Sequence, residues 1–257
     1  MNKLIYSALF LAMTANPVLA EEAENNSNTE TADFIQRQVQ QNMSIGRAIK
    51  SIVSHYPQDV EVVVGTALDL YPEHYKEVIH AAISAQPALT EDVVRIAIEK
   101  GITSCTNIVE TAINAEPSYV DFVVNAAAHS TPDELNDIVR VAVVTEPNSA
   151  DSIVRSVAKA HPNKLVDIIR TAMEAVPFVG EYIVETLLAA YPESADQVVT
   201  TAVQESGSHR QNLQRILETA RSAGLSDEML TQYALQGGAT QEEITAILAK
   251  QGHEEEN

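Results

Sequence analysis

The chain has 257 residues, of which 45% are hydrophobic and only 5% aromatic, with no tryptophan and one cysteine. Its formal net charge of −20 repels phosphate backbones and anionic lipid, which argues against nucleic-acid binding and against electrostatic docking on membranes. A single cysteine excludes a disulfide within the chain, so packing of Val, Ile, Leu and Ala must stabilise the fold.

Residues 1–20 are predicted to be a secretory signal peptide. A short apolar stretch follows Lys3, and the sequence VLA at 18–20 matches a small-residue cleavage site, with cutting after Ala20. A periplasmic or secreted protein is therefore expected. No later stretch approaches the roughly 18 uninterrupted apolar residues of a membrane span, so no membrane insertion is expected.

The segment after the cleavage site, residues 21–31 (EEAENNSNTET), is polar and acidic and is predicted to be disordered. Residues 32–41 are predicted to form a short helix that caps the N-terminal end of the following structure. The tail at 253–257 is also predicted to be disordered, because it is polar and mostly acidic.

Between these segments the prolines reveal a 15-residue repeat. Every proline after residue 20 falls on one 15-residue grid, and a single step of 30 residues occurs where Ile102 takes the proline position. A random proline would share the phase about once in fifteen trials, so the repeat is real. These prolines are Pro57, Pro72, Pro87, Pro117, Pro132, Pro147, Pro162, Pro177 and Pro192.

Within each repeat the apolar residues predict a helix. When the proline is counted as position one, positions four, seven, eight, eleven and twelve are mostly apolar, a spacing that forms one stripe of an α-helix. The proline suits the first helical turn and drives the residue before it out of the α region. Each repeat is therefore predicted to be one helix of about 12 residues. Position eleven is mostly alanine: Ala67, Ala82, Ala97, Ala112, Ala127, Ala142, Ala172 and Ala202.

The short connections require neighbouring helices to run antiparallel, and such helices bury their stripes by stacking. We therefore expect an all-α fold, an α-solenoid with one helix per 15-residue repeat, over residues 42–221. Residues 222–252 are predicted to add capping helices, at about 226–235 and 240–250. Thr240 and Glu243 form a capping-box pattern before the last helix.

In architecture the predicted array resembles HEAT, armadillo and tetratricopeptide proteins. Segments such as YPESADQVVTTAVQES match none of their signatures, and are similar to Pro/Ala/Val-rich helical repeats of exported bacterial proteins without assigned activities. The resemblance implies an elongated array and a role in interaction, and it implies no functional residues.

No motif for catalysis, for a cofactor or for a phosphate loop is present, and the seven histidines are dispersed. No catalytic residue, cofactor or metal site is therefore expected, and the protein is not expected to be an enzyme. Weak binding of divalent cations by the acidic faces stays open. Cys105, at repeat position four, is interpreted as a small buried apolar residue rather than a reactive thiol.

One charged pattern offers a candidate partner-binding site. Arg140, Arg155 and Arg170 occupy position nine of three successive repeats, and stacking is expected to align them along one face. They could form neutralised surface pairs with nearby aspartates, or a strip that binds carboxylates of a partner peptide. The preferred reading is an exported scaffold for protein–protein interaction, and the alternative is a self-assembling structural component of an envelope or extracellular assembly.

Overall fold

The computed structural model describes residues 17–41, 43–207 and 209–251, with side chains described from residue 28 to 249. Over these residues the chain consists of helices and short connections, without a strand. The predicted all-α class is therefore confirmed. Most of the predicted signal peptide (1–16) and the whole predicted acidic tail (253–257) lie outside the described residues.

The helices follow one another at nearly constant spacing along the chain. Their bounds are α1 (Pro17–Gln40), α2 (Ile45–His55), α3 (Val60–Leu70), α4 (Tyr75–Ala85), α5 (Thr90–Lys100), α6 (Cys105–Ala115), α7 (Val120–Ser130), α8 (Leu135–Thr145), α9 (Ala150–Ala160), α10 (Leu165–Ala175), α11 (Gly180–Ala190), α12 (Ala195–Ser206), α13 (Arg210–Ser222), α14 (Asp227–Gln236) and α15 (Gln241–Gln251).

Each in-phase proline opens a three-residue 3₁₀ turn that continues directly into an α-helix, which has 11 residues in α4, after Pro72–His74, and 12 residues in α12. Only one residue separates this unit from the previous helix. Tyr71, for example, has φ −134° and ψ 58°, yet its N–H still bonds the carbonyl of Ala67. The sequence predicted helices of about 12 residues with longer links. The helical unit is longer because the proline itself begins a 3₁₀ turn that the α-helix extends.

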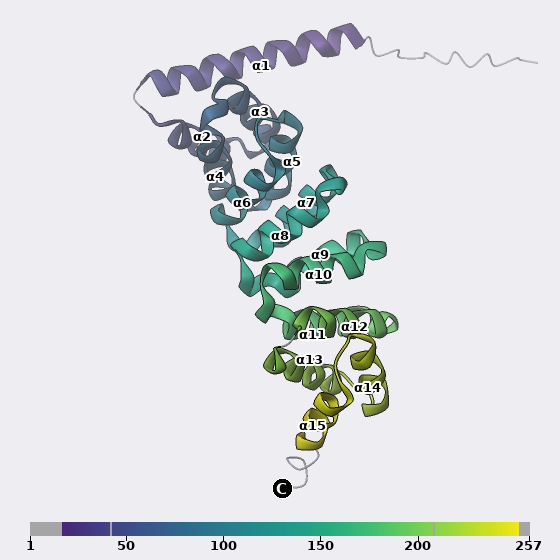
Figure 1. Ribbon diagram of the computed structural model, residues 1–257. Coiled ribbons are helices and arrows are strands. Elements are labelled where there is room, and N and C mark those ends of the chain that lie inside the picture. The colour runs from purple at the N-terminus through teal and green to yellow at the C-terminus, as the bar shows by residue number, and fades with distance from the viewer. Residues whose placement is uncertain (1–16, 42, 208, 252–257) are drawn as a thin grey trace, which may run out of the picture.

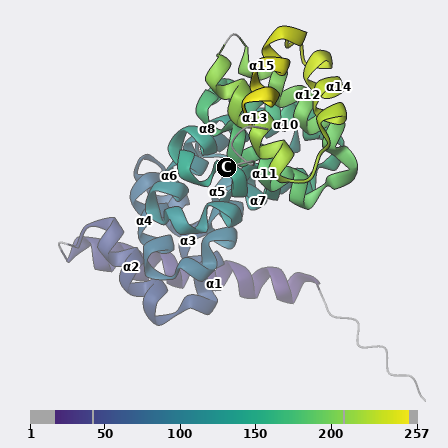
Figure 2. The ribbon, with the colours of Figure 1, turned by 90° about the horizontal axis from the view of Figure 1, so that it is seen from below.

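Two layers build the array (Figure 1). Even-numbered helices from α2 to α14 pack on one another, odd-numbered helices from α1 to α13 do the same, and consecutive antiparallel helices pack between the layers. Figure 2 looks along the stack from the α15 end, with α1 at the far end. The predicted α-solenoid is thus confirmed. An important consequence is that residues 30 positions apart are neighbours in one layer.

The repeat stripe forms the core between the layers. Residues at positions seven, eight and eleven are buried in every repeat from residue 42 to residue 206, and the alanines of position eleven lie where the helices pack. The fully buried large residues include Ile79, Ile108, Ile138, Ile153 and Ile168. Because buried aliphatic area supplies most of the stabilisation, this periodic stripe accounts for a fold without disulfides.

The N-terminal end differs from the prediction. A single helix, α1, runs through 21–31, which we expected to be disordered, and continues through the expected cap helix at 32–41. The C-terminal half of α1 is anchored to the array: Ile35 is completely buried, and α1 packs on α3. Once a helix is anchored, each added residue gains a backbone hydrogen bond, and Glu and Ala are good helix formers.

The repeat without a proline keeps its place in the stack. α5 ends at Gly101, which has φ 61° and whose N–H bonds the carbonyl of Ile98, as expected for a glycine that ends a helix. Ser104 then caps α6, its hydroxyl accepting from the N–H of Asn107. At the other end, α14 and α15 match the predicted capping helices, and the capping box between Thr240 and Glu243 is formed.

Candidate functional site

The three arginines singled out by the sequence do not share a face. Arg140 and Arg170 lie on α8 and α10 in the even layer, whereas Arg155 lies on α9 in the odd layer. The expectation of one continuous strip is therefore wrong. Consecutive repeats lie in opposite layers, so position nine of every second repeat, and not of every repeat, lines up along a face.

Two of these arginines already bind carboxylates of their own chain. An Arg140 guanidinium nitrogen lies 3.5 Å from Glu174 on α10, and Nε of Arg170 lies 3.2 Å from Oε1 of Glu205 on α12. Arg170 also pairs with Asp167 at 3.6 Å, as the sequence suggested. These contacts connect successive helices of the even layer. Arg155 is exposed, and no described side chain forms an ion pair with it.

A groove at the N-terminal end of the even layer gathers cations that remain unpaired. It crosses α2, α4 and α6, which pack side by side, and has a volume of about 650 Å³. The small residues Gly46, Ala81 and Ser84 line it, and longer charged side chains surround them. Its lining is completed by Ser44, Arg47, Lys50, Lys76, Glu77, His80, Glu110, Thr111 and Asn114.

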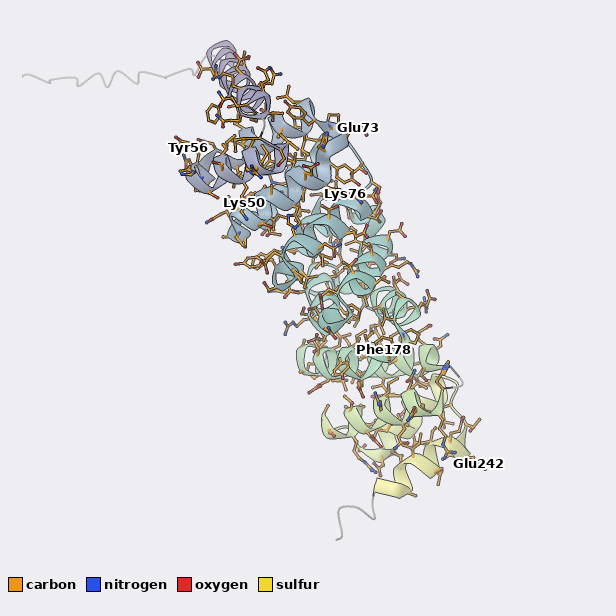
Figure 3. The ribbon with its side chains drawn as sticks, turned by 90° about the vertical axis from the view of Figure 1, so that its left-hand side faces the viewer. Lys50, Tyr56, Glu73, Lys76, Phe178 and Glu242 are labelled. Carbon is orange, nitrogen blue, oxygen red and sulfur yellow. The ribbon has the colours of Figure 1, made fainter. Side chains whose placement is uncertain are left out.

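Arg47 and Lys50 on α2 and Lys76 on α4 are exposed, and none of them has an ion-pair partner among the described side chains. Figure 3 shows Lys50 and Lys76 at the N-terminal end of the array. The carboxylate of Glu77 is hydrogen-bonded to Nδ1 of His74 at 2.9 Å. Unpaired cations are notable in a chain with a net charge of −20, where carboxylates greatly outnumber them.

Elsewhere in the array most described cations are neutralised. Those with ion-pair partners are Arg95, Lys100, Arg140, Lys164, Arg170, Arg215 and Arg221. A comparison of consecutive repeats does not reveal the groove, because its lining residues lie on alternate helices. Lys50 and His80 both occupy position nine and are 30 residues apart, so a search at twice the repeat length would have placed them together.

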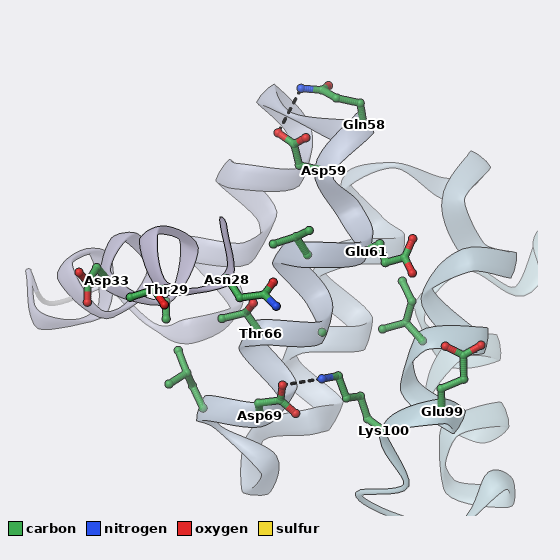
Figure 4. A pocket seen from close by; sticks show the side chains of 15 residues that line it. Asn28, Thr29, Asp33, Gln58, Asp59, Glu61, Thr66, Asp69, Glu99 and Lys100 are labelled. Atoms are coloured by element: carbon green, nitrogen blue, oxygen red, sulfur yellow. Dashed lines mark hydrogen bonds and ion pairs between the residues drawn. The ribbon is translucent and has the colours of Figure 1, made fainter. Parts of the chain in front are cut away.

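A second groove lies across α1, α3 and α5 in the odd layer, with a volume of about 900 Å³ (Figure 4). Its polar lining is mainly acidic and includes Asp33, Glu61 and Glu99. The one cation, Lys100, lies 2.5 Å from Oδ2 of Asp69. The groove therefore presents a negative surface, opposite in sign to the unpaired cations of the α2–α4–α6 groove.

Over the residues whose side chains are described, no group of three or more His, Cys, Asp or Glu side chains could hold a metal ion. None of the described helices is long and apolar enough to cross a membrane.

Cys105 is buried, as expected, and its Sγ accepts a hydrogen bond from the Thr131 hydroxyl at 3.2 Å. Burial raises the pKa of this thiol, which makes it a poor nucleophile.

Comparison with models of known protein families, with curated proteins and with solved structures finds no match for this chain. The surfaces of the array itself are therefore the guide to its function.

Proposed function

We propose that the protein is an exported helical-repeat scaffold that binds other proteins and does not catalyse a reaction. Export is inferred from residues 1–20, which have the pattern of a cleavable signal peptide. The observation that carries the binding role is the α2–α4–α6 groove, an open surface whose lysines and arginine form no ion pair with any described side chain. Solenoids use such extended surfaces for recognition.

The groove's dimensions and lining suit binding better than chemistry. Its volume lies in the range of ligand sites, but its charged side chains are exposed, so water is not excluded from them. General acid–base or nucleophilic catalysis relies on groups held in a protected site with matched pKa values. The groove supplies charge and shape for recognition, which is the role we assign to it.

Chemical crosslinking followed by affinity capture and mass spectrometry tests the binding role. The purified scaffold should capture a protein that, when produced separately, binds it saturably in solution. The same chain unfolded in urea is the control for native structure, because binding that needs the folded array should be lost there. If no captured protein binds in purified form, the scaffold role is rejected.

Export is tested separately by cell fractionation and N-terminal sequencing of the mature protein. The expected product is found outside the cytoplasm and begins at Glu21. A cytoplasmic protein that retains Met1 would reject this part of the proposal and leave the binding role to its own test.

A further inference from the structure

We propose that the α2–α4–α6 groove binds an extended, acidic segment of a partner protein. The inference rests on the proposed scaffold function and adds to it the location of the site and the chemistry of its ligand. Arg47, Lys50 and Lys76 surround one hollow, and none of them pairs with a described carboxylate, although Nζ of Lys76 lies 6.0 Å from the centre of the Tyr75 ring. The cations further along the array mostly pair with carboxylates. A ligand carrying carboxylates would supply the missing partners.

The charges within the groove also orient the ligand. The three cations lie on α2 and α4, whereas α6 contributes Glu110 and the neutral Asn114. Glu77 is hydrogen-bonded to His74, on the same helical unit. An acidic segment should therefore place its carboxylates over α2 and α4 and a neutral stretch over α6, because a carboxylate facing Glu110 would be repelled.

The shape of the groove favours an extended chain. The groove crosses three parallel helices of one layer, and packed helices lie about 8–10 Å apart. A polyproline-II segment rises about 3.1 Å per residue and has three residues per turn, so side chains on one of its faces recur about every 9 Å. Such a segment can present one side chain to each helix. The small residues Gly46, Ala81 and Ser84 leave room for its backbone.

The occupant is a partner rather than a second copy of this chain. Each copy carries a formal charge of −20, so two copies repel each other before short-range contacts form. A separate protein can present a local acidic segment without an equally large net negative charge.

Binding of labelled hexaglutamate, measured by fluorescence anisotropy on the full chain at low and physiological salt, tests the site. We expect saturable binding that weakens with salt because screening reduces the attraction. The triple variant Arg47→Gln, Lys50→Gln, Lys76→Gln should lose about tenfold or more in affinity. The matched control is Arg37→Gln, Arg155→Gln, Lys159→Gln, which removes the same charge from exposed sites outside the groove.

The control triple should retain nearly wild-type affinity, and Glu110→Gln should bind hexaglutamate more tightly than the wild type. Circular dichroism melting checks that each variant is folded. No binding at low salt, or equal losses in the two triples, would overturn the groove assignment. If the chain self-associates and only the triple variant of Arg47, Lys50 and Lys76 loses this self-association, the groove binds a second copy and the choice of a separate partner is wrong. If a captured partner binds the groove triple normally, the scaffold function stands while this site is rejected.

Discussion

Nε of Arg170 lies 3.2 Å from Oε1 of Glu205 and connects α10 to α12 across one step of the even layer. Similar contacts connect other steps: Arg140 with Glu174, Lys100 with Asp69, and Arg215 with Glu181. In each case the partners are roughly two repeats apart in sequence. These longer-range ion pairs therefore follow the layers and not the order of successive repeats.

A double-mutant cycle with Arg170→Gln and Glu205→Gln should give a coupling free energy of about 0.2–1 kcal/mol in favour of folding. The value should be small because the Arg170 side chain is 39% exposed and the pair is accessible to solvent. It should also decrease as salt is added. Chemical denaturation supplies the free energies, and Arg155→Gln, which removes an unpaired arginine, is the control. A coupling of zero at low salt would mean that the contact does not stabilise the layer.

The alanine of repeat position eleven should tolerate little increase in size. Ala142 is 0% exposed and lies among the buried residues of the array. Ala142→Leu should cost about 1–3 kcal/mol of unfolding free energy because the added atoms overpack the interface. Val144 on the same helix is 57% exposed, so Val144→Leu should change stability by less than about 0.5 kcal/mol. Equal melting temperatures for the two variants would contradict the packing described.

Replacement by alanine should lower the stability of the protein at Gly237 and raise it at Gly65. A Cβ on Gly237 would lie 2.7 Å from Cβ of Val203 and 2.8 Å from the carbonyl oxygen of Thr200, so Gly237→Ala should cost about 1–3 kcal/mol. A Cβ on Gly65 would meet mainly the flexible end of Lys100, at 3.2 Å. Gly65→Ala should therefore stabilise α3 by up to about 1 kcal/mol. Thermal melts decide both signs, and a stabilised Gly237→Ala protein would refute the close packing of α14 on α12.

Cys105 should make the free energy of unfolding depend on pH in the alkaline range. Its pKa is raised, first by burial and also by the nearby charge of Glu134, while the Thr131 hydrogen bond opposes this. The folded state therefore holds the thiol proton more tightly than the unfolded state. Its stabilising contribution is complete below the unfolded pKa and is lost as pH rises through the folded pKa.

Urea denaturation from neutral to alkaline pH should accordingly show a loss of stability that is smaller in Cys105→Val. Valine occupies the same repeat position at Val60 and Val120, and Thr131 keeps its bond to the Ala127 carbonyl. The native thiol should also react slowly with a thiol reagent. Identical pH dependence in the two proteins, or rapid labelling, would show that the thiol is not held in the core.

Much of this fold can be predicted from sequence, because each repeat buries the same positions. The proline grid and the apolar stripe, which ends at Val143 or Met173, define a helix without reference to the rest of the chain. The layer of the array on which a given surface residue lies is harder to predict. Two-layer packing depends on how an antiparallel pair stacks on the next pair, so the stripe alone does not say that Arg155 lies in the other layer from Arg140 and Arg170.

The groove was missed for the same reason. Arg47, Lys50 and Lys76 look like scattered surface charges until α2 and α4 are known to be neighbours. The long α1 was missed because residues 21–31 lack an apolar stripe of their own. Their helical structure follows from continuity with a segment anchored by Ile35, which local composition does not reveal.

The most direct test of the two-layer arrangement is a pair of dipolar spin-label distances in a Cys105→Val background. Labels at Arg140→Cys and Arg170→Cys should lie about one helix spacing apart, roughly 10 Å plus the length of the label arms. Labels at Arg140→Cys and Arg155→Cys should be separated by two helix diameters, roughly 20 Å or more. A 140–155 distance equal to or shorter than the 140–170 distance would contradict the layers on which the groove and its proposed ligand depend.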